Sequence, residues 1–147
     1  MTEFCHGGTL FDTLYKKNLD LSLEQKLKML KDIAKGMYFM HTHRPPFMHR
    51  DLKSLNILLM NEVKGPSDYV CCKIADFGMT RTIEEESEMA LTNMAGTFHW
   101  MAPEVMEKKG YSEKADVYSY GMVMWEILAR EPPFKNHSLP QIIRGVT

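Results

Sequence analysis

The sequence contains no apolar run of about 18 residues, the length that a membrane-spanning helix needs. It also has no excess of charge of either sign, because 18 Lys and Arg stand against 19 Asp and Glu, and the formal net charge is −1. A nearly neutral chain gives no reason to expect a nucleic acid or an anionic membrane as partner. We therefore expect a protein that binds neither.

Cysteine is scarce and poorly placed for disulfides. Only Cys5, Cys71 and Cys72 occur, and ordinary disulfide geometry does not favour a bond between two adjacent residues. An odd number of cysteines in an ordinary globular chain fits a reducing compartment. The cysteine usage therefore predicts a cytoplasmic protein.

The rest of the composition is that of a folded domain, since 44% of the 147 residues are hydrophobic and 25% are charged. Ser22 and Gln25 form a capping box that predicts the start of a long amphipathic helix. Its expected apolar face consists of Leu23, Leu27, Leu30, Ile33, Ala34, Met37 and Tyr38. His41 and His43 near its end lack partners at metal-ligand spacing, so we do not expect zinc there.

Further elements follow along the chain. Ile57–Met60 and Tyr69–Ile74 read as two short strands joined by a loop that contains Gly and Pro. A second long helix is expected to begin at Ser112 and to be buried, because it is apolar nearly all round as far as Leu128. A short helix is expected to begin at Ser138.

The most informative stretch is His49–Asn56, which reads His-Arg-Asp-Leu-Lys-Ser-Leu-Asn. Phosphoryl transfer requires a carboxylate to take the proton of the attacking hydroxyl, a ligand for magnesium and positive charge near the moving phosphoryl group. Asp51, Asn56 and Lys53 offer these functions in that order. The alternative is a surface turn that contains these residues by chance.

Two further motifs follow, Asp-Phe-Gly at Asp76–Gly78 and Ala-Pro-Glu at Ala102–Glu104. With these three motifs in this order, the sequence resembles a protein kinase from its first residue to its last. The resemblance implies an α+β protein-kinase-like fold. This chain would be the mainly α-helical C-terminal lobe with a small two-stranded ribbon, and the N-terminal lobe would be absent.

The resemblance also divides the chain. Residues 1–147 would form a partial kinase domain with its hinge at 2–9, catalytic loop at 49–56 and activation segment at 76–104, truncated after 147. The sequence contains neither the glycine-rich G-x-G-x-x-G loop nor the lysine of a V-A-I-K motif, both of which precede the hinge in kinases.

By the same resemblance, the ligands are ATP and Mg²⁺. The catalytic residues would be Asp51, Lys53, Asn56 and Asp76, and the metal would lie on Asn56 and Asp76. The nucleotide-binding residues would be Glu3, Cys5, Thr9, Lys53, Leu58 and Asp76. At the local level, a Gly-Gly turn before a helix explains the hinge stretch equally well.

Two acidic residues have expected structural roles. Asp116, in the first turn of its helix, either satisfies free backbone N–H groups there or, as the resemblance implies, steadies the catalytic loop. Glu104 pairs with a later Arg in kinases, and Arg130 and Arg144 are the candidates within this sequence.

The segment between Gly78 and Ala102 shows no hydrophobic periodicity and carries an acidic run that reads as a solvated loop. In kinases with an Arg at the position of Arg50, this guanidinium can receive a phosphate on the loop and order it. We expect phosphorylation of Thr92, or of Ser87, to switch the enzyme on. An upstream activating kinase is thus a possible partner.

Lys53 and Thr97 resemble the residues that serine/threonine kinases have at these positions, whereas Trp100–Val105 and Asp116–Gly121 resemble tyrosine kinases. This mixture is typical of the tyrosine-kinase-like group, whose members phosphorylate Ser and Thr in protein substrates. The alternatives are a dual-specificity or tyrosine kinase, a non-catalytic binding or regulatory fragment that engages a protein partner, and a product without a role. The intact catalytic set favours the kinase, and the missing glycine-rich loop favours the last two for this chain alone.

Overall fold

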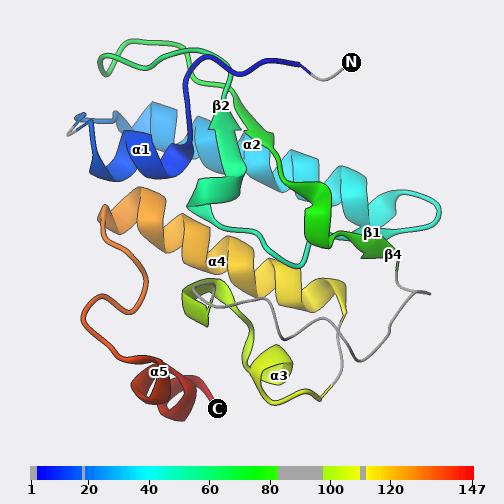
Figure 1. The fold of residues 1–147 in the computed structure, drawn as a ribbon. Coiled ribbons are helices and arrows are strands. Elements are labelled where there is room, and N and C mark those ends of the chain that lie inside the picture. Colours follow the sequence, from blue (N-terminus) through cyan, green and yellow to red (C-terminus); the bar gives the residue numbers. More distant parts are fainter. Residues whose placement is uncertain (1–2, 18, 83–97, 110–111) are drawn as a thin grey trace.

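The computed structural model describes residues 3–17, 19–82, 98–109 and 112–147, and their regular structure is mainly helical (Figure 1). Two long helices pack against each other, α2 (Leu23–Thr42) and α4 (Glu113–Ala129). The shorter helices are α1 (Leu10–Tyr15), α3 (Pro103–Met106) and α5 (Leu139–Val146). The 3-10 turns within the described residues are η1 (Ser54–Asn56), η2 (Phe77–Met79) and η4 (Phe98–Trp100).

The expected two-stranded ribbon is present but shorter than predicted. Strand β2 (Ile57–Leu59) pairs in antiparallel fashion with β3 (Cys72–Ile74). Past these bounds one bond at each end continues the ladder, from the Met60 N–H to the Cys71 carbonyl at 3.0 Å and from the Ala75 N–H to the Asn56 carbonyl at 2.9 Å. The ribbon therefore joins the end of the catalytic loop to the residues before Asp76.

A second antiparallel pair was not predicted. Strand β1 (Phe47–Met48) precedes the catalytic loop and pairs with β4 (Arg81–Thr82), which follows the Asp-Phe-Gly motif. Two residues per strand are too few to show the alternation that identifies a strand in a sequence. The pair brings the segment that enters the catalytic loop against the segment that leaves Asp76–Gly78.

Helix α2 begins as predicted, with both halves of the capping box formed by Ser22 and Gln25. The predicted apolar face is partly wrong, because Leu23, Leu27 and Tyr38 are 66%, 55% and 71% exposed. The buried face consists of Gln25, Met29, Leu30, Ile33, Met37 and Met40. Its first position is polar because the Gln25 amide donates hydrogen bonds to the carbonyls of Gly65 and Asp68 in the loop between β2 and β3.

Helix α4 is not buried all round, contrary to the prediction. Trp125 is 54% exposed, whereas the buried face carries three polar side chains, those of Asp116, Ser119 and Glu126. These side chains are buried because they bind loop groups packed against the helix. Ser119, for example, donates its hydroxyl proton to the Trp100 carbonyl at 2.7 Å.

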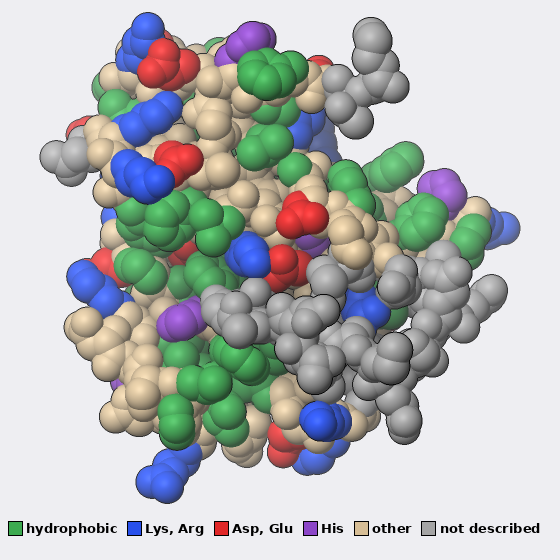
Figure 2. Space-filling model, viewed as in Figure 1, with side chains coloured by type: hydrophobic (Ala, Val, Ile, Leu, Met, Phe, Trp, Pro, Cys, Tyr) green, Lys and Arg blue, Asp and Glu red, His purple; other side chains and the backbone are tan. Residues whose placement is uncertain are grey.

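One apolar core unites the elements that carry the candidate site. It includes fully buried side chains from α1, α2, the catalytic loop, β2 and α4, namely Leu10, Met29, Leu52, Ile57, Leu59, Val123 and Ile127. On the face shown in Figure 2, hydrophobic side chains gather in the lower part of the view, where α3, η4 and α5 lie. None of the helices in the described residues has the length and apolar character needed to cross a membrane.

Candidate active site

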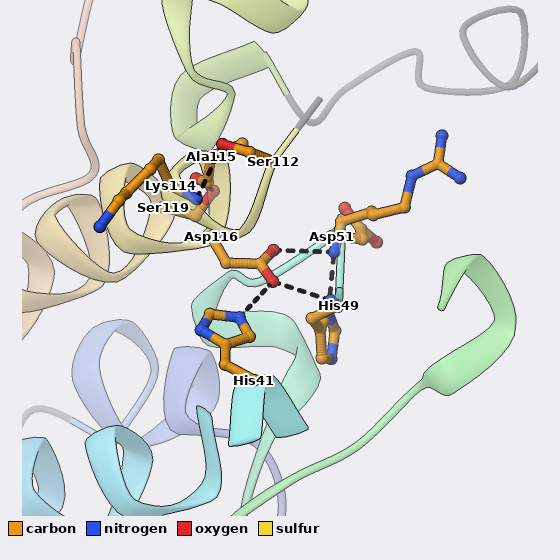
Figure 3. A network of polar contacts seen from close by, with 9 residues as sticks. His41, His49, Asp51, Ser112, Lys114, Ala115, Asp116 and Ser119 are labelled. Carbon is orange, nitrogen blue, oxygen red and sulfur yellow. Dashed lines mark hydrogen bonds and ion pairs between the residues drawn. The ribbon is translucent and has the colours of Figure 1, made fainter. Parts of the chain in front are cut away.

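The entrance to the catalytic loop is held by Asp116, which lies on the buried face of α4 (Figure 3). One carboxylate oxygen accepts the N–H of His49 at 2.8 Å, and the other accepts the N–H of Arg50 at 2.9 Å. Arg50 has φ of 68°, a left-handed conformation that is costly for a side chain other than glycine. The paired bonds stabilise this conformation. Of the two roles considered for Asp116, the structure therefore places it against the catalytic loop.

His41 is a contributor that sequence reasoning missed. Its Nε2 lies 2.9 Å from a carboxylate oxygen of Asp116, so α2 and α4 approach the loop entrance from two sides (Figure 3). The two residues are 75 positions apart in the sequence, and no local pattern connects them. His43 contacts the Pro45 carbonyl instead, at 3.0 Å.

His49 links the loop to the Asp-Phe-Gly motif. Its ring is completely buried and contacts the Asp51 N–H through Nδ1 at 3.3 Å and the Ala75 carbonyl through Nε2 at 3.1 Å. Because a backbone N–H only donates and a carbonyl only accepts, these partners place the proton of the neutral imidazole on Nε2. The residue before Asp76 is thereby fixed to the catalytic loop.

Asp51, Lys53 and Asn56, three of the four predicted catalytic residues, form one cluster. The Lys53 ammonium lies 2.7 Å from one Asp51 carboxylate oxygen and 3.0 Å from the other. The Asn56 side-chain amide donates to the same carboxylate at 2.9 Å and to the Asp51 backbone carbonyl at 2.8 Å. The Asp51 side chain remains 12% exposed, so it is oriented but still open to an incoming group.

Asp76 stands at the end of the ribbon and is exposed. The Ala75 N–H donates to the Asn56 carbonyl at 2.9 Å, which ties the two predicted metal ligands to one framework. Within the described residues, the one hydrogen bond to the Asp76 carboxylate comes from the Gly78 N–H at 3.3 Å. Asp76 thus presents an oxygen-rich side chain toward solvent.

The stretch predicted as a hinge lies along the free edge of β2. The N–H groups of His6 and Gly7 donate to the carbonyls of Met60 and Leu59, at 3.1 and 2.9 Å. A methyl group on Gly7 would come within 2.2 Å of the backbone oxygen of Asn61, just past β2, so only glycine fits this approach. Thr9 then forms a β-bridge to Leu58, so two of the predicted nucleotide-binding residues are neighbours.

Thr9 also caps α1, a role that the sequence analysis did not assign. Its hydroxyl accepts the Asp12 N–H at 3.0 Å and donates to the Asp12 carboxylate at 2.8 Å. The hydrogen bond from the neighbouring Lys16 ammonium, together with the Thr9 hydroxyl, lowers the pKa of Asp12. Glu3 forms an exposed ion pair with Lys73 at 3.2 Å, and the Cys5 thiol contacts the Met60 sulfur at 3.7 Å.

Some predicted residues lie outside the described part of the chain, namely Ser87, Thr92 and Thr97. Of the two candidates for Glu104, Arg130 is engaged elsewhere, since its guanidinium donates to the carbonyls of Leu14 and Leu19. Arg130 is the left-handed residue that follows α4, and its side chain binds the end of α1 and the segment after it. Arg130 is therefore not the partner of Glu104.

Comparison with known proteins gives a match over the whole chain. Residues 1–147 match the family model described as protein tyrosine and serine/threonine kinase. A probable serine/threonine-protein kinase of Dictyostelium discoideum is 44% identical over 139 residues, which are 94% of this chain and 13% of that protein. The serine/threonine-protein kinase STY46 of Arabidopsis thaliana is 41% identical over 147 residues, 99% of this chain and 24% of that protein. The mitogen-activated protein kinase kinase kinase dlk-1 of Caenorhabditis briggsae is 40% identical over 144 residues, 98% of this chain and 16% of that protein.

Proposed function

Because the chain belongs to the protein tyrosine and serine/threonine kinase family, we propose that it is the catalytic part of a protein serine/threonine kinase of the tyrosine-kinase-like group. The reaction would transfer the γ-phosphoryl group of ATP to Ser and Thr hydroxyls of proteins. The proposal rests on one observation: Lys53 and Asn56 hold the Asp51 carboxylate in place, and that carboxylate remains accessible to solvent. A general base needs both properties, a fixed position and access to the proton it takes.

Each member of this cluster has a distinct role in the proposal. Asp51 accepts the proton of the acceptor hydroxyl as its oxygen attacks phosphorus. Lys53 holds the carboxylate and keeps a positive charge beside the transferred group, where negative charge must be stabilised. Asn56 fixes Asp51 through its amide N–H, which leaves its carbonyl oxygen for a metal ion.

Asn56 and Asp76 are the residues that would hold Mg²⁺. Among the described residues, no group of three or more His, Cys, Asp or Glu could hold a metal ion. Two oxygen ligands nevertheless suit Mg²⁺, which keeps several waters and is often bound by one or two carboxylates together with substrate phosphates. When bound, the ion supplies positive charge to the phosphate oxygens.

The proposed nucleotide site lies beside β2. The adenine ring would bind the backbone of Glu3 and Cys5, with Leu58 beneath it and Thr9 toward the ribose. Support comes from the β-bridge between Thr9 and Leu58, which makes the end of the hinge and the pocket floor neighbours. The engagement of Thr9 with Asp12 makes this pair, rather than Thr9 alone, the polar group at that end of the site.

Arg50 would receive a phosphate on Thr92 or Ser87, and Thr97 would act with Lys53 to admit short hydroxyl side chains. The chain spans no more than 24% of the three relatives described above. We propose that it supplies the hinge and large lobe of a longer kinase, with the catalytic loop at 49–56 and the activation segment at 76–104.

The test uses the complete polypeptide that contains these residues, incubated with Mg²⁺, γ-labelled ATP and a generic basic protein. Label should pass to the protein, and Asp51→Asn should lower turnover by a factor of about 10² or more. The affinity for ATP should change little, because the carboxylate meets the hydroxyl and not the nucleotide. Unchanged turnover in Asp51→Asn would contradict the proposal.

A further inference from the structure

Glu126 is a fully buried carboxylate near the end of α4, and it binds three segments that are far apart in the sequence. One oxygen accepts the Tyr15 hydroxyl at 3.0 Å and the Ser54 hydroxyl at 2.6 Å. The other accepts the indole N–H of Trp100 at 2.7 Å. These three donors are neutral, and among the described residues no cation forms an ion pair with Glu126.

Each partner belongs to a segment with a different task in the proposed reaction. Tyr15 ends α1, the helix capped by Thr9 beside the nucleotide site. Ser54 lies in the catalytic loop between Lys53 and Asn56. Trp100 ends η4 and leads directly into the Ala-Pro-Glu motif, on the side of the activation segment.

The Asp116 and Glu126 carboxylates on α4 bind opposite ends of the catalytic loop. Asp116 binds its entrance at His49 and Arg50, and Glu126 binds its exit at Ser54. Glu126 lies ten positions after Asp116, a rise of about 15 Å along the helix. The loop is therefore fixed to one rigid helix at two widely separated points.

Burial of this carboxylate is costly unless its hydrogen bonds are complete. Burial raises the pKa of Glu126, and the bonds from Ser54, Trp100 and Tyr15 act in the opposite direction. An apolar side chain would fill the same place in the core without this cost. Packing alone therefore does not explain a carboxylate here. The three donors do, because only an acceptor at this place can bind all of them.

We propose that Glu126 is a positioning residue that sets the nucleotide side, the catalytic loop and the acceptor side of the site relative to one another. It touches no reactant, and the inference rests on the proposed kinase function. Its consequence is that each of the three hydrogen bonds affects a different kinetic constant. Tyr15 acts on the KM for ATP, Ser54 on kcat and Trp100 on the KM for the acceptor protein.

The test removes one donor at a time in the complete polypeptide, with Tyr15→Phe, Ser54→Ala and Trp100→Phe. Each substitution keeps most of the side-chain volume and deletes one hydrogen bond to a charged group. We expect about a fivefold to tenfold change in the assigned constant. The other two constants should stay within about twofold.

Two matched controls lie on the same helix. Tyr120→Phe deletes a hydroxyl that donates to the Leu30 carbonyl at 3.1 Å, away from the three segments. Trp125→Phe alters an exposed indole. Both should leave all three constants within about twofold of the unmodified protein.

Glu126→Gln is the conservative variant. Its carbonyl can accept the Trp100 N–H while its NH₂ group donates to the two hydroxyl oxygens, so activity should largely survive. An unmodified protein without phosphotransfer would overturn the proposed function and this inference together. An active protein in which the three donor variants leave every constant unchanged, or change all constants equally, would overturn the inference alone.

Discussion

At the scale of single residues, Asp51 and Asp76 are two carboxylates near one loop whose surroundings differ. Asp51 is held by the Lys53 ammonium and the Asn56 amide, and only 12% of its side chain is exposed. Asp76 is exposed and receives one backbone hydrogen bond within the described residues. The first environment suits a general base that must be held in place, and the second suits a ligand that completes a metal site when substrate arrives.

The two aspartates should therefore respond differently to removal of their charge. In the complete protein, Asp76→Asn should raise the Mg²⁺ concentration needed for half-maximal activity, because a charged metal ligand becomes neutral. Asp51→Asn should lower turnover without moving this concentration. Titration of activity with Mg²⁺ measures both effects. Equal shifts in the two variants would mean that the roles are assigned wrongly.

At the scale of elements, local signals were predicted well and long-range contacts were not. The capping box of α2 was predicted because its two members lie within a few residues of one another. Asp51, Lys53 and Asn56 are equally close in the sequence, which is why a local motif could single them out as candidates. The burial of Glu126 was not predicted, because one of its partners lies 111 positions away in the sequence.

The predictions of which faces of α2 and α4 are buried were wrong for the same reason. The apolar residues of α2 and α4 extend round more than one side of each helix, and tertiary packing chose which side to bury. Tyr38 and Trp125 remain exposed as a result. Thr9 shows a related ambiguity, since a hydroxyl before a helix can be a cap, a ligand or both.

The packing of the stretch predicted as a hinge against β2 can be tested at this scale. Gly7→Ala should lower the free energy of unfolding by about 1–3 kcal/mol, because the added methyl group meets backbone and Leu59 at 2.2–2.7 Å. The KM for ATP should rise as the hinge shifts. Urea unfolding and steady-state kinetics measure the two effects.

Gly65→Ala is the matched control, because no atom lies within 4 Å of its added methyl group. Its stability should stay within about 0.5 kcal/mol of the unmodified protein. A Gly7→Ala variant as stable and as active as Gly65→Ala would contradict the described packing of the hinge on β2.

The activation segment gives a second prediction for an element. Simultaneous replacement of Thr92 and Ser87 by Ala in the complete protein should lower activity. Alanine cannot be phosphorylated, so no phosphate at these positions can bind Arg50. Kinase assays after treatment with an activating kinase or a phosphatase measure the effect. Activity that is unchanged by the double replacement would rule out this switch.

At the scale of the whole molecule, the described surface includes large apolar side chains on both long helices. Tyr38 and Phe39 on α2 are 71% and 68% exposed, and Trp125 on α4 is 54% exposed. Exposed apolar surface of this kind indicates either a protein–protein interaction site or a tendency of the protein to aggregate. The isolated 147-residue chain should therefore self-associate more readily than the complete protein.

The same chain alone should bind ATP weakly and transfer phosphate negligibly. In kinases, the glycine-rich loop and its lysine supply much of the contact to the phosphates, and the sequence of this chain contains neither. Calorimetric titration with Mg²⁺ and ATP, beside a phosphotransfer assay, measures both quantities. Turnover near about 1 per second, within the usual kinase range, would contradict this expectation.

We propose that Asp51, Lys53 and Asn56 form the catalytic cluster of a serine/threonine kinase. Lys53 and Thr97 are proposed to shape the place where a short hydroxyl side chain reaches Asp51. A tyrosine hydroxyl stands farther from its backbone, and misplacement of about 1 Å can cost around 10² in rate.

The most direct measurement is phosphoamino-acid analysis of an exogenous protein after brief incubation with the complete polypeptide, Mg²⁺ and labelled ATP. We expect phosphoserine and phosphothreonine, and their loss in the Asp51→Asn variant. Phosphotyrosine as the main product would contradict the acceptor assignment, and label that persists in Asp51→Asn would contradict the assignment of the general base.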